Sequence, residues 1–164
     1  MAQEKFLIFI IDDDVFMRNV LESFILSKYE GAKVVVYETG EKAMLDMHQR
    51  PDVILLDYHL NSKEEEALNG LEILKRIKHL LYNVPVIFLS ASEDPQISAD
   101  IIKYGAFDYI VKGKEALPRL EVMINNATGH LSMQKQIETQ KVFNRILFIL
   151  LVFILLLFII TRFI

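Results

Sequence analysis

The sequence predicts an α/β domain built on a doubly wound parallel sheet, followed by a C-terminal helix. Short apolar runs of strand length alternate along the chain with segments that carry apolar residues at three- and four-residue spacing. Strands that are covered on both faces of a parallel sheet are expected to be nearly continuous apolar runs, and amphipathic helices show the wider spacing. Glycine and proline residues mark the boundaries between the two kinds of segment.

Five βα units follow from this alternation, with helices on both faces of the sheet. The predicted strands are Phe6–Ile11, Val34–Tyr37, Val53–Leu56, Val86–Leu89 and Tyr109–Val111. The predicted helices are Val15–Tyr29, Glu41–His48, Leu71–Leu81 and Ile97–Tyr104, with a fifth from about Glu115 to about Gly129.

The amino-acid composition and the distribution of charge exclude several classes of function for this chain. The chain has 164 residues and no cysteine, which excludes disulfides and thiolate metal sites. Residues 1–134 carry 14 basic and 21 acidic side chains, whereas the last thirty carry four basic side chains and one acidic. An acidic domain argues against a nucleic-acid partner, which requires a cationic surface.

Polar residues follow the predicted strands at their carboxyl ends. Three aspartates, Asp12 to Asp14, follow the first strand, Asp57 ends the third, Ser90 ends the fourth and Lys112 follows the fifth. In doubly wound sheets ligands bind beyond this edge, near the switch in strand order. We therefore expect these side chains to converge on one site.

The residue types at this edge indicate phosphoryl chemistry. Crowded carboxylates repel one another and call for a cation, and oxygen ligands suit Mg²⁺. Lys112 supplies a fixed positive charge, Ser90 a hydroxyl, and Asp57 is the candidate nucleophile for phosphoryl transfer. Aspartates after a strand can instead cap a helix N-terminus, which is the role that we expect for Asp14.

Five stretches, "FIIDDDVFMR", "PDVILLDYHL", "NGLEILKRIK", "VPVIFLSAS" and "GAFDYIVK", resemble the receiver domain of response regulators in two-component signalling. They occur in order, at the spacing of that family, from about Lys5 to about Thr128. The resemblance implies a flavodoxin-like (βα)5 fold. It also implies a phosphoacceptor signalling domain rather than an enzyme, although slow autodephosphorylation is compatible with it.

The resemblance assigns a role to each candidate residue. Asp57 would accept a phosphoryl group from a histidine kinase or a phosphotransfer protein. Asp13 and Asp57 would bind Mg²⁺ directly, Asp12 through a bound water, and His59 through its backbone carbonyl. The remaining assignments are Ser90 as the hydroxyl that turns toward the phosphoryl group, Tyr109 as the aromatic switch residue and Lys112 as the partner of the phosphoryl group.

The chain departs from the family pattern at three places. Gly113 follows Lys112 where the family usually has a proline, often in a cis bond, so a trans peptide bond is expected here. The segment "HLNSKEEEALNG" between Asp57 and Gly70 is longer than the usual loop by about five residues. His59 and Ser92 occupy positions that tune dephosphorylation in the family, and neither supplies a carboxamide or carboxylate that would position a water.

The C-terminal part predicts a membrane anchor on a polar helical linker. Residues 129–141 are polar and favour a helix, and because there is no Gly or Pro between His130 and Ile164, one continuous helix is expected there. Residues 142–164 are almost entirely apolar, with no polar side chain from 146 to 160. A helix over residues 146–164 would be about 28 Å long, close to the thickness of the hydrocarbon core. The alternative is a helix buried against another chain, and a homodimer is compatible with the sequence.

The combined prediction is a response regulator with a receiver domain at residues 1–128 and a transmembrane tail. Basic residues before the apolar run would keep the receiver in the cytoplasm by the positive-inside rule. Phosphorylation of Asp57 would depend on Mg²⁺ and would signal through a protein contact at the membrane. Two alternatives are a membrane scaffold with a receiver fold that is not phosphorylated, and a phosphate sink for a kinase.

Overall fold

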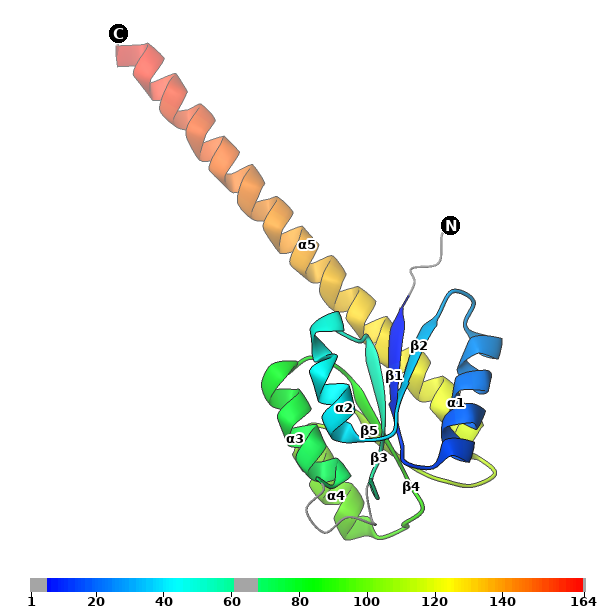
Figure 1. The fold of residues 1–164 in the computed structure, drawn as a ribbon. Helices are drawn as coiled ribbons and strands as arrows, with labels where there is room; N and C mark the ends of the chain where they lie inside the picture. The colour runs from blue at the N-terminus through cyan, green and yellow to red at the C-terminus, as the bar shows by residue number, and fades with distance from the viewer. Residues whose placement is uncertain (1–5, 61–67, 164) are drawn as a thin grey trace. The chain divides into compact units, whose positions relative to one another are not determined.

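The computed structural model describes residues 6–60 and 68–163 of the chain. For helical residues 130–136, 138 and 152–163 it describes the backbone alone. Its elements alternate between strand and helix from the first strand to the last helix (Figure 1).

The five strands form one parallel sheet, as the sequence predicted, in the order β2-β1-β3-β4-β5. Strand order reverses between β1 and β3, which is the switch point where ligands bind in doubly wound sheets. Each strand lies within one residue of its predicted bounds. The strands are β1 Leu7–Ile11, β2 Lys33–Tyr37, β3 Val53–Asp57, β4 Val86–Ser90 and β5 Asp108–Val111.

Helices cover both faces of the sheet. One face packs against α2, α3 and α4, and the other against α1 and the first part of α5 (Figure 1). The fifth helix was predicted to end around Gly129, and this prediction is wrong, because α5 continues through that residue. The helices are α1 Val15–Lys28, α2 Gly40–Leu45, α3 Gly70–Leu80, α4 Pro95–Lys103 and α5 Ala116–Phe163, with a 3-10 helix η1 at Met47–Gln49.

The alternation of side chains along the strands produces two cores, one on each face. Phe9, Ile54 and Phe88 face α2 and α3, whereas their neighbours Ile8 and Leu55 face α1 and α5. Successive strand residues point to opposite faces, so a strand buried on both sides has no polar positions. The strands that carry the site are therefore packed on both faces.

Polar caps start the helices at the edge that carries the site. The Asp14 carboxylate accepts hydrogen bonds from two amides of the first turn of α1, which confirms the predicted cap. Asn69 and Glu72 form a reciprocal capping box at the start of α3, and Asp94 caps α4. Caps of this kind satisfy amides that have no partner within the helix.

The C-terminal part of α5 forms a unit of its own. The chain divides into residues 1–128 and residues 129–164. The prediction of one continuous helix after residue 130 is confirmed, since α5 runs without a break to Phe163. Described apolar side chains from Ile146 to Leu151 are all more than half exposed.

The predicted transmembrane tail and the membrane-anchored location are corrected by the structure. Within the described residues, no helix is both long enough and apolar enough to cross a membrane. A span needs about 20 predominantly apolar residues, but the described side chains end at Leu151. The rest of the predicted span, residues 152–164, lies outside the residues whose side chains are described.

Candidate functional site

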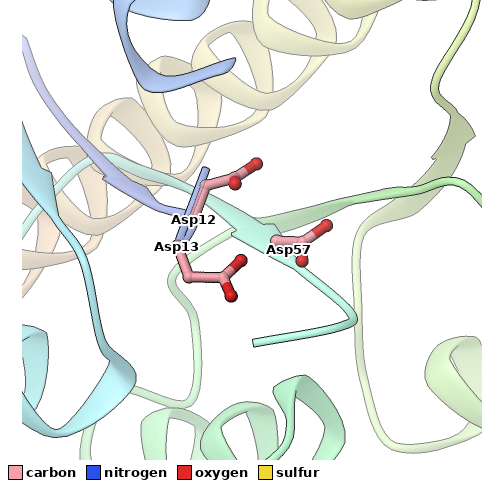
Figure 2. Close-up of side chains that lie close together, drawn as sticks. All are labelled: Asp12, Asp13 and Asp57. Carbon is pink, nitrogen blue, oxygen red and sulfur yellow. The ribbon is translucent and has the colours of Figure 1, made fainter. Parts of the chain in front are cut away.

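Three carboxylates gather at the carboxyl ends of β1 and β3. Asp12 and Asp13 directly follow β1, and Asp57 is the last residue of β3 (Figure 2). One carboxylate oxygen from each of the three lies within 4.8 Å of the others. Because β1 and β3 are hydrogen-bonded neighbours in parallel register, the chain brings residues 45 positions apart to one point.

Lys112 bridges two of these carboxylates from the end of β5. Its amino nitrogen lies 2.8 Å from Asp12 Oδ2 and 2.7 Å from Asp57 Oδ1. The Lys112 amide donates to the Ser90 carbonyl at 2.7 Å, which fixes the end of β5 beside the end of β4. The cation is thus held in place by the sheet itself.

Burial and charge act in opposite directions on the groups in this site. Burial raises the pKa of Asp12 above its usual range, and the hydrogen bond from Lys112 offsets only part of this effect. Burial by itself would lower the pKa of Lys112, but its bonds to Asp12 and Asp57 outweigh burial and leave that pKa raised. The lysine therefore carries its charge at every physiological pH.

Ser90, at the end of β4, and Tyr109, in β5, both contact Ser92 in the loop between β4 and α4. The Ser90 side chain is fully buried, and its hydroxyl accepts a hydrogen bond from the Ser92 amide at 3.1 Å. The Tyr109 hydroxyl donates to the carbonyl of the same Ser92, and the tyrosine is buried. This loop is consequently tied to the site through the backbone of one residue.

His59 contributes its backbone to the site. Its amide donates to Asp57 Oδ2 at 2.9 Å and so orients the carboxylate that the sequence singled out. Its ring is exposed and packs edge-on against Tyr58, with 4.9 Å between the ring centroids. The predicted role of the His59 carbonyl as a metal ligand remains a prediction.

The loop after Lys112 has the expected trans geometry. No peptide bond is cis among the described residues, which include the Lys112–Gly113 bond. A Cβ added at Gly113 would have no atom within 4 Å. The lengthened part of the loop after β3, residues 61–67, lies outside the described residues.

Sequence reasoning missed two residues that shape the site. A Cβ added at Gly70 would lie 2.4 Å from the backbone oxygen of Asp57, so only glycine allows α3 to start so close to β3. The Arg18 guanidinium donates to the backbone carbonyl of Asp12 and braces the loop that carries Asp12 and Asp13. The only sequence signal for Gly70 is its place after the capping Asn69, and for Arg18 its place one turn after Asp14.

A family model matches residues 8–125, and the family is the response regulator receiver domain. The chain belongs to this family, which confirms the resemblance. Receiver domains are phosphoacceptors rather than enzymes, they interact with histidine kinases or phosphotransfer proteins, and they bind Mg²⁺ through an acidic pocket.

Individual relatives agree with this assignment. A protein-glutamate methylesterase/protein-glutamine glutaminase of Bacillus licheniformis is 33% identical over 108 residues, which cover 64% of this chain and 29% of that protein. A probable C4-dicarboxylate response regulator, DctR, of Halalkalibacterium halodurans is 30% identical over 147 residues, covering 84% of this chain and 59% of that protein. The chain therefore spans less than two thirds of either relative.

A solved structure shows the same fold. The response regulator domain of CheB from Thermotoga maritima is 29% identical, with a TM-score of 0.67, and the match covers 77% of this chain and 98% of that one. The donor set of the present chain fits the metal of the family, because its three clustered side chains all offer carboxylate oxygens, which Mg²⁺ prefers.

Proposed function

We propose that this chain accepts a phosphoryl group on Asp57 from the phosphohistidine of a histidine kinase or of a phosphotransfer protein. The observation that supports this most directly is the pairing of Asp57 with Lys112 at 2.7 Å inside the carboxylate cluster. A carboxylate held between a fixed cation and a candidate metal site has the surroundings that phosphoryl transfer requires.

The chemistry follows from these positions. An Asp57 carboxylate oxygen attacks the phosphorus, the bond from phosphorus to the histidine nitrogen breaks, and the imidazole leaves with the electron pair. Mg²⁺ bound by Asp13 and Asp57, by Asp12 through water and by the His59 carbonyl would neutralise charge on the phosphoryl oxygens. Lys112 can turn from the Asp57 carboxylate to the new phosphoryl group.

Output would depend on the loop between β4 and α4. An aspartyl phosphate adds negative charge and acceptor oxygens, which attract hydrogen-bond donors nearby. Ser90 is the buried hydroxyl at the end of β4, and Tyr109 reaches the same loop at Ser92. A shift of Ser90 toward the phosphoryl group would therefore alter the contacts of Tyr109, and we propose that a protein partner senses this surface.

Phosphorylation of the full chain by acetyl phosphate with MgCl₂ tests the proposal. We expect the wild-type chain to gain the mass of one phosphoryl group and Asp57→Asn to gain none. Asp14→Asn is the matched control, because asparagine caps a helix as well as aspartate does. Equal phosphorylation of wild type and Asp57→Asn would contradict the assignment of Asp57.

A receiver-fold scaffold that is not phosphorylated is the second candidate, and Gly113 in place of the family's usual proline is the observation that favours it. A chain of this kind would neither bind Mg²⁺ nor respond to beryllium fluoride, which mimics a phosphoryl group. A phosphate sink would instead lose its phosphoryl group rapidly and would have no downstream partner.

A further inference from the structure

A hollow lies on the surface between α2 and α3, on the sheet face opposite α1. It has a volume of about 380 Å³ and is open to solvent along one side. The two helices lie side by side in the layer that covers this face (Figure 1). The residues that line the hollow are Met44, Lys75, Arg76, His79 and Leu80.

The apolar residues of the hollow are Met44 and Leu80, one from each helix. Leu80 is 56% exposed and does not belong to the core on this face. Met44 is half-buried and packs against that core, so its side chain reaches from the core to the hollow. Grouped exposed apolar side chains with a polar rim are typical of interaction sites.

The rim of the hollow is cationic, although the domain as a whole is acidic. Lys75, Arg76 and His79 all have exposed side chains on α3. The Lys75 amino group lies over the Tyr104 ring, 4.2 Å from its centroid, so its position is defined. Within the described part of the chain, Arg76 and His79 take part in no ion pair.

One basic residue of α3 is excluded from this rim. Lys78 turns inward and donates to the carbonyl of Val84 at 2.7 Å, and burial lowers its pKa. The rim charges are therefore a property of one helix face and not of α3 as a whole. Glu72 is the acidic residue of α3, and its carboxylate already accepts a hydrogen bond from the Asn69 amide in the capping box.

We propose that this surface binds an acidic amphipathic helix from a partner protein. One large apolar side chain of that helix would fill the hollow between Met44 and Leu80, and carboxylates beside it would pair with Lys75 and Arg76. Side chains three and four residues apart share a helix face, so one helix can present both groups. The hollow is open to solvent, whereas a small molecule binds best in an enclosed cavity. A side chain of a partner protein therefore suits this hollow better than a small molecule does.

This surface is connected to the phosphorylation site through α3. The first residue of α3, Gly70, contacts the backbone of Asp57 and Tyr58, and the last, Leu80, lines the hollow. A helix bound along α3 would hold the element that packs directly against the candidate phosphoacceptor. The binding proposal itself does not require phosphorylation and is tested without a phosphodonor.

Fluorescence anisotropy of the full chain with a labelled helical peptide of 18 residues tests the proposal. The peptide carries leucines along one face and glutamates on both flanks. We expect binding that weakens with added salt and that Arg76→Glu weakens by about tenfold or more. Arg119→Glu is the matched control, since it makes the same charge change on exposed α5 and should leave binding unchanged.

Further variants test the apolar part of the contact. Leu80→Ala should weaken binding by about fivefold through lost apolar burial, and Leu26→Ala, an equally exposed leucine on α1, should have no effect. A peptide with its central leucine changed to serine should bind as weakly as the wild-type peptide binds Leu80→Ala. Thermal unfolding of each variant confirms that it is folded.

Two outcomes would overturn the proposal. The first is failure of the glutamate peptide to bind, and the second is equal binding of a peptide whose glutamates are changed to lysines. In the first case, binding of a small amphiphile such as decanoate at these residues would assign the hollow to a small anionic ligand.

Discussion

Lys112 and Asp57 are joined by an ion pair of 2.7 Å, although strand β4 lies between their strands, because Asp57 ends β3 and Lys112 directly follows β5. The lysine side chain is 19% exposed and that of the aspartate 5%, so the pair is largely shielded from water. The same lysine also pairs with Asp12, which is more deeply buried. One cation thus pairs with two carboxylates near the switch point of the sheet.

Without the positive charge of Lys112, repulsion between the Asp12 and Asp57 carboxylates should destabilise the fold. We expect Lys112→Met to lower the free energy of unfolding by about 3 kcal/mol in metal-free buffer, because two buried carboxylates lose their partner. MgCl₂ should raise the melting temperature of this variant more than that of wild type, since the metal can replace the lost charge. Thermal unfolding with and without MgCl₂ measures both effects.

Lys114→Met is the matched control for this prediction. It removes the same charge from an exposed side chain two residues further along the same loop. Surface substitutions of this kind change stability by about 0.5 kcal/mol or less. Equal losses for the two variants would show that the bridging position of Lys112 does not matter.

Two glycines near the site should respond in opposite ways to alanine. A Cβ at Gly70 would lie 2.4 Å from the Asp57 oxygen and 2.9 Å from the Tyr58 Cα, and neither backbone atom can turn away. We expect Gly70→Ala to cost about 1–3 kcal/mol and to slow phosphorylation by moving Asp57. Urea unfolding and acetyl phosphate labelling measure these effects.

Gly113→Ala provides the comparison, since a Cβ there has no neighbour within 4 Å. We expect this variant to gain about 0.4–1 kcal/mol, because alanine reduces the freedom of the unfolded chain. A destabilised Gly113→Ala variant would mean that the loop after Lys112 needs the flexibility of glycine.

Phe16 is a candidate contact for a phosphodonor protein. It is 71% exposed in the first turn of α1, two residues after the capping Asp14 and close to the carboxylate cluster. We expect Phe16→Ala to slow phosphotransfer from a histidine kinase by about tenfold, because exposed aromatics at interfaces carry much of the binding energy. Transfer from acetyl phosphate should be unchanged, since that donor needs no protein contact.

Leu26→Ala, at the other end of α1 and 52% exposed, is the control for Phe16→Ala. Its rates with both donors should match those of wild type. If Phe16→Ala slowed phosphorylation equally with acetyl phosphate and with the kinase, the substitution would act on the phosphorylation site and not on the docking of the kinase.

Tyr29 should make stability fall at alkaline pH. Its hydroxyl donates to the Glu121 carbonyl at 3.2 Å, and burial, followed by the charge of Glu121, raises its pKa to about 12. An unfolded tyrosine ionises near pH 10. The folded chain holds this proton more tightly than the unfolded chain does. The contribution of Tyr29 to the free energy of unfolding is therefore complete below pH 10 and is lost as the pH rises toward 12.

Urea unfolding at several pH values between 8 and 12 measures this contribution. Tyr29→Phe should be less stable than wild type at pH 8 and should lose less stability above pH 10. Tyr82→Phe is the control, because Tyr82 is 81% exposed. Identical pH profiles for wild type and Tyr29→Phe would contradict the prediction.

The sheet and most of the site could be predicted because both follow from simple periodicity. Apolar runs without polar positions identify the buried strands, and parallel strands bring their carboxyl ends to one edge. Asp12, Asp57 and Lys112 could therefore be placed together from the order of strands and polar residues alone. The strand bounds differ from the predicted ones by at most one residue, because backbone hydrogen bonds and not apolarity define where a strand ends.

Other features depend on distances that no sequence pattern carries. The approach of Gly70 to Asp57 depends on the path of the loop after β3, and the bond from Arg18 to the Asp12 carbonyl depends on where α1 begins. The fifth helix continues through Gly129 because one glycine costs only about 1 kcal/mol of helix stability, which the long helical segments on either side can offset. The hollow between α2 and α3 depends on how two helices pack side by side, and the sequence pattern of each helix alone does not specify that packing.

The interior position of β1 has a consequence for synthesis on the ribosome. This strand emerges before both of its neighbours, β2 and β3, and β3 ends only at residue 57. Until then, one edge of a fully apolar strand stays open to other nascent chains, and open strand edges promote aggregation. Chains that stall or are cut before residue 57 are thus expected to be substrates for chaperones, whereas longer ones can close the sheet around β1.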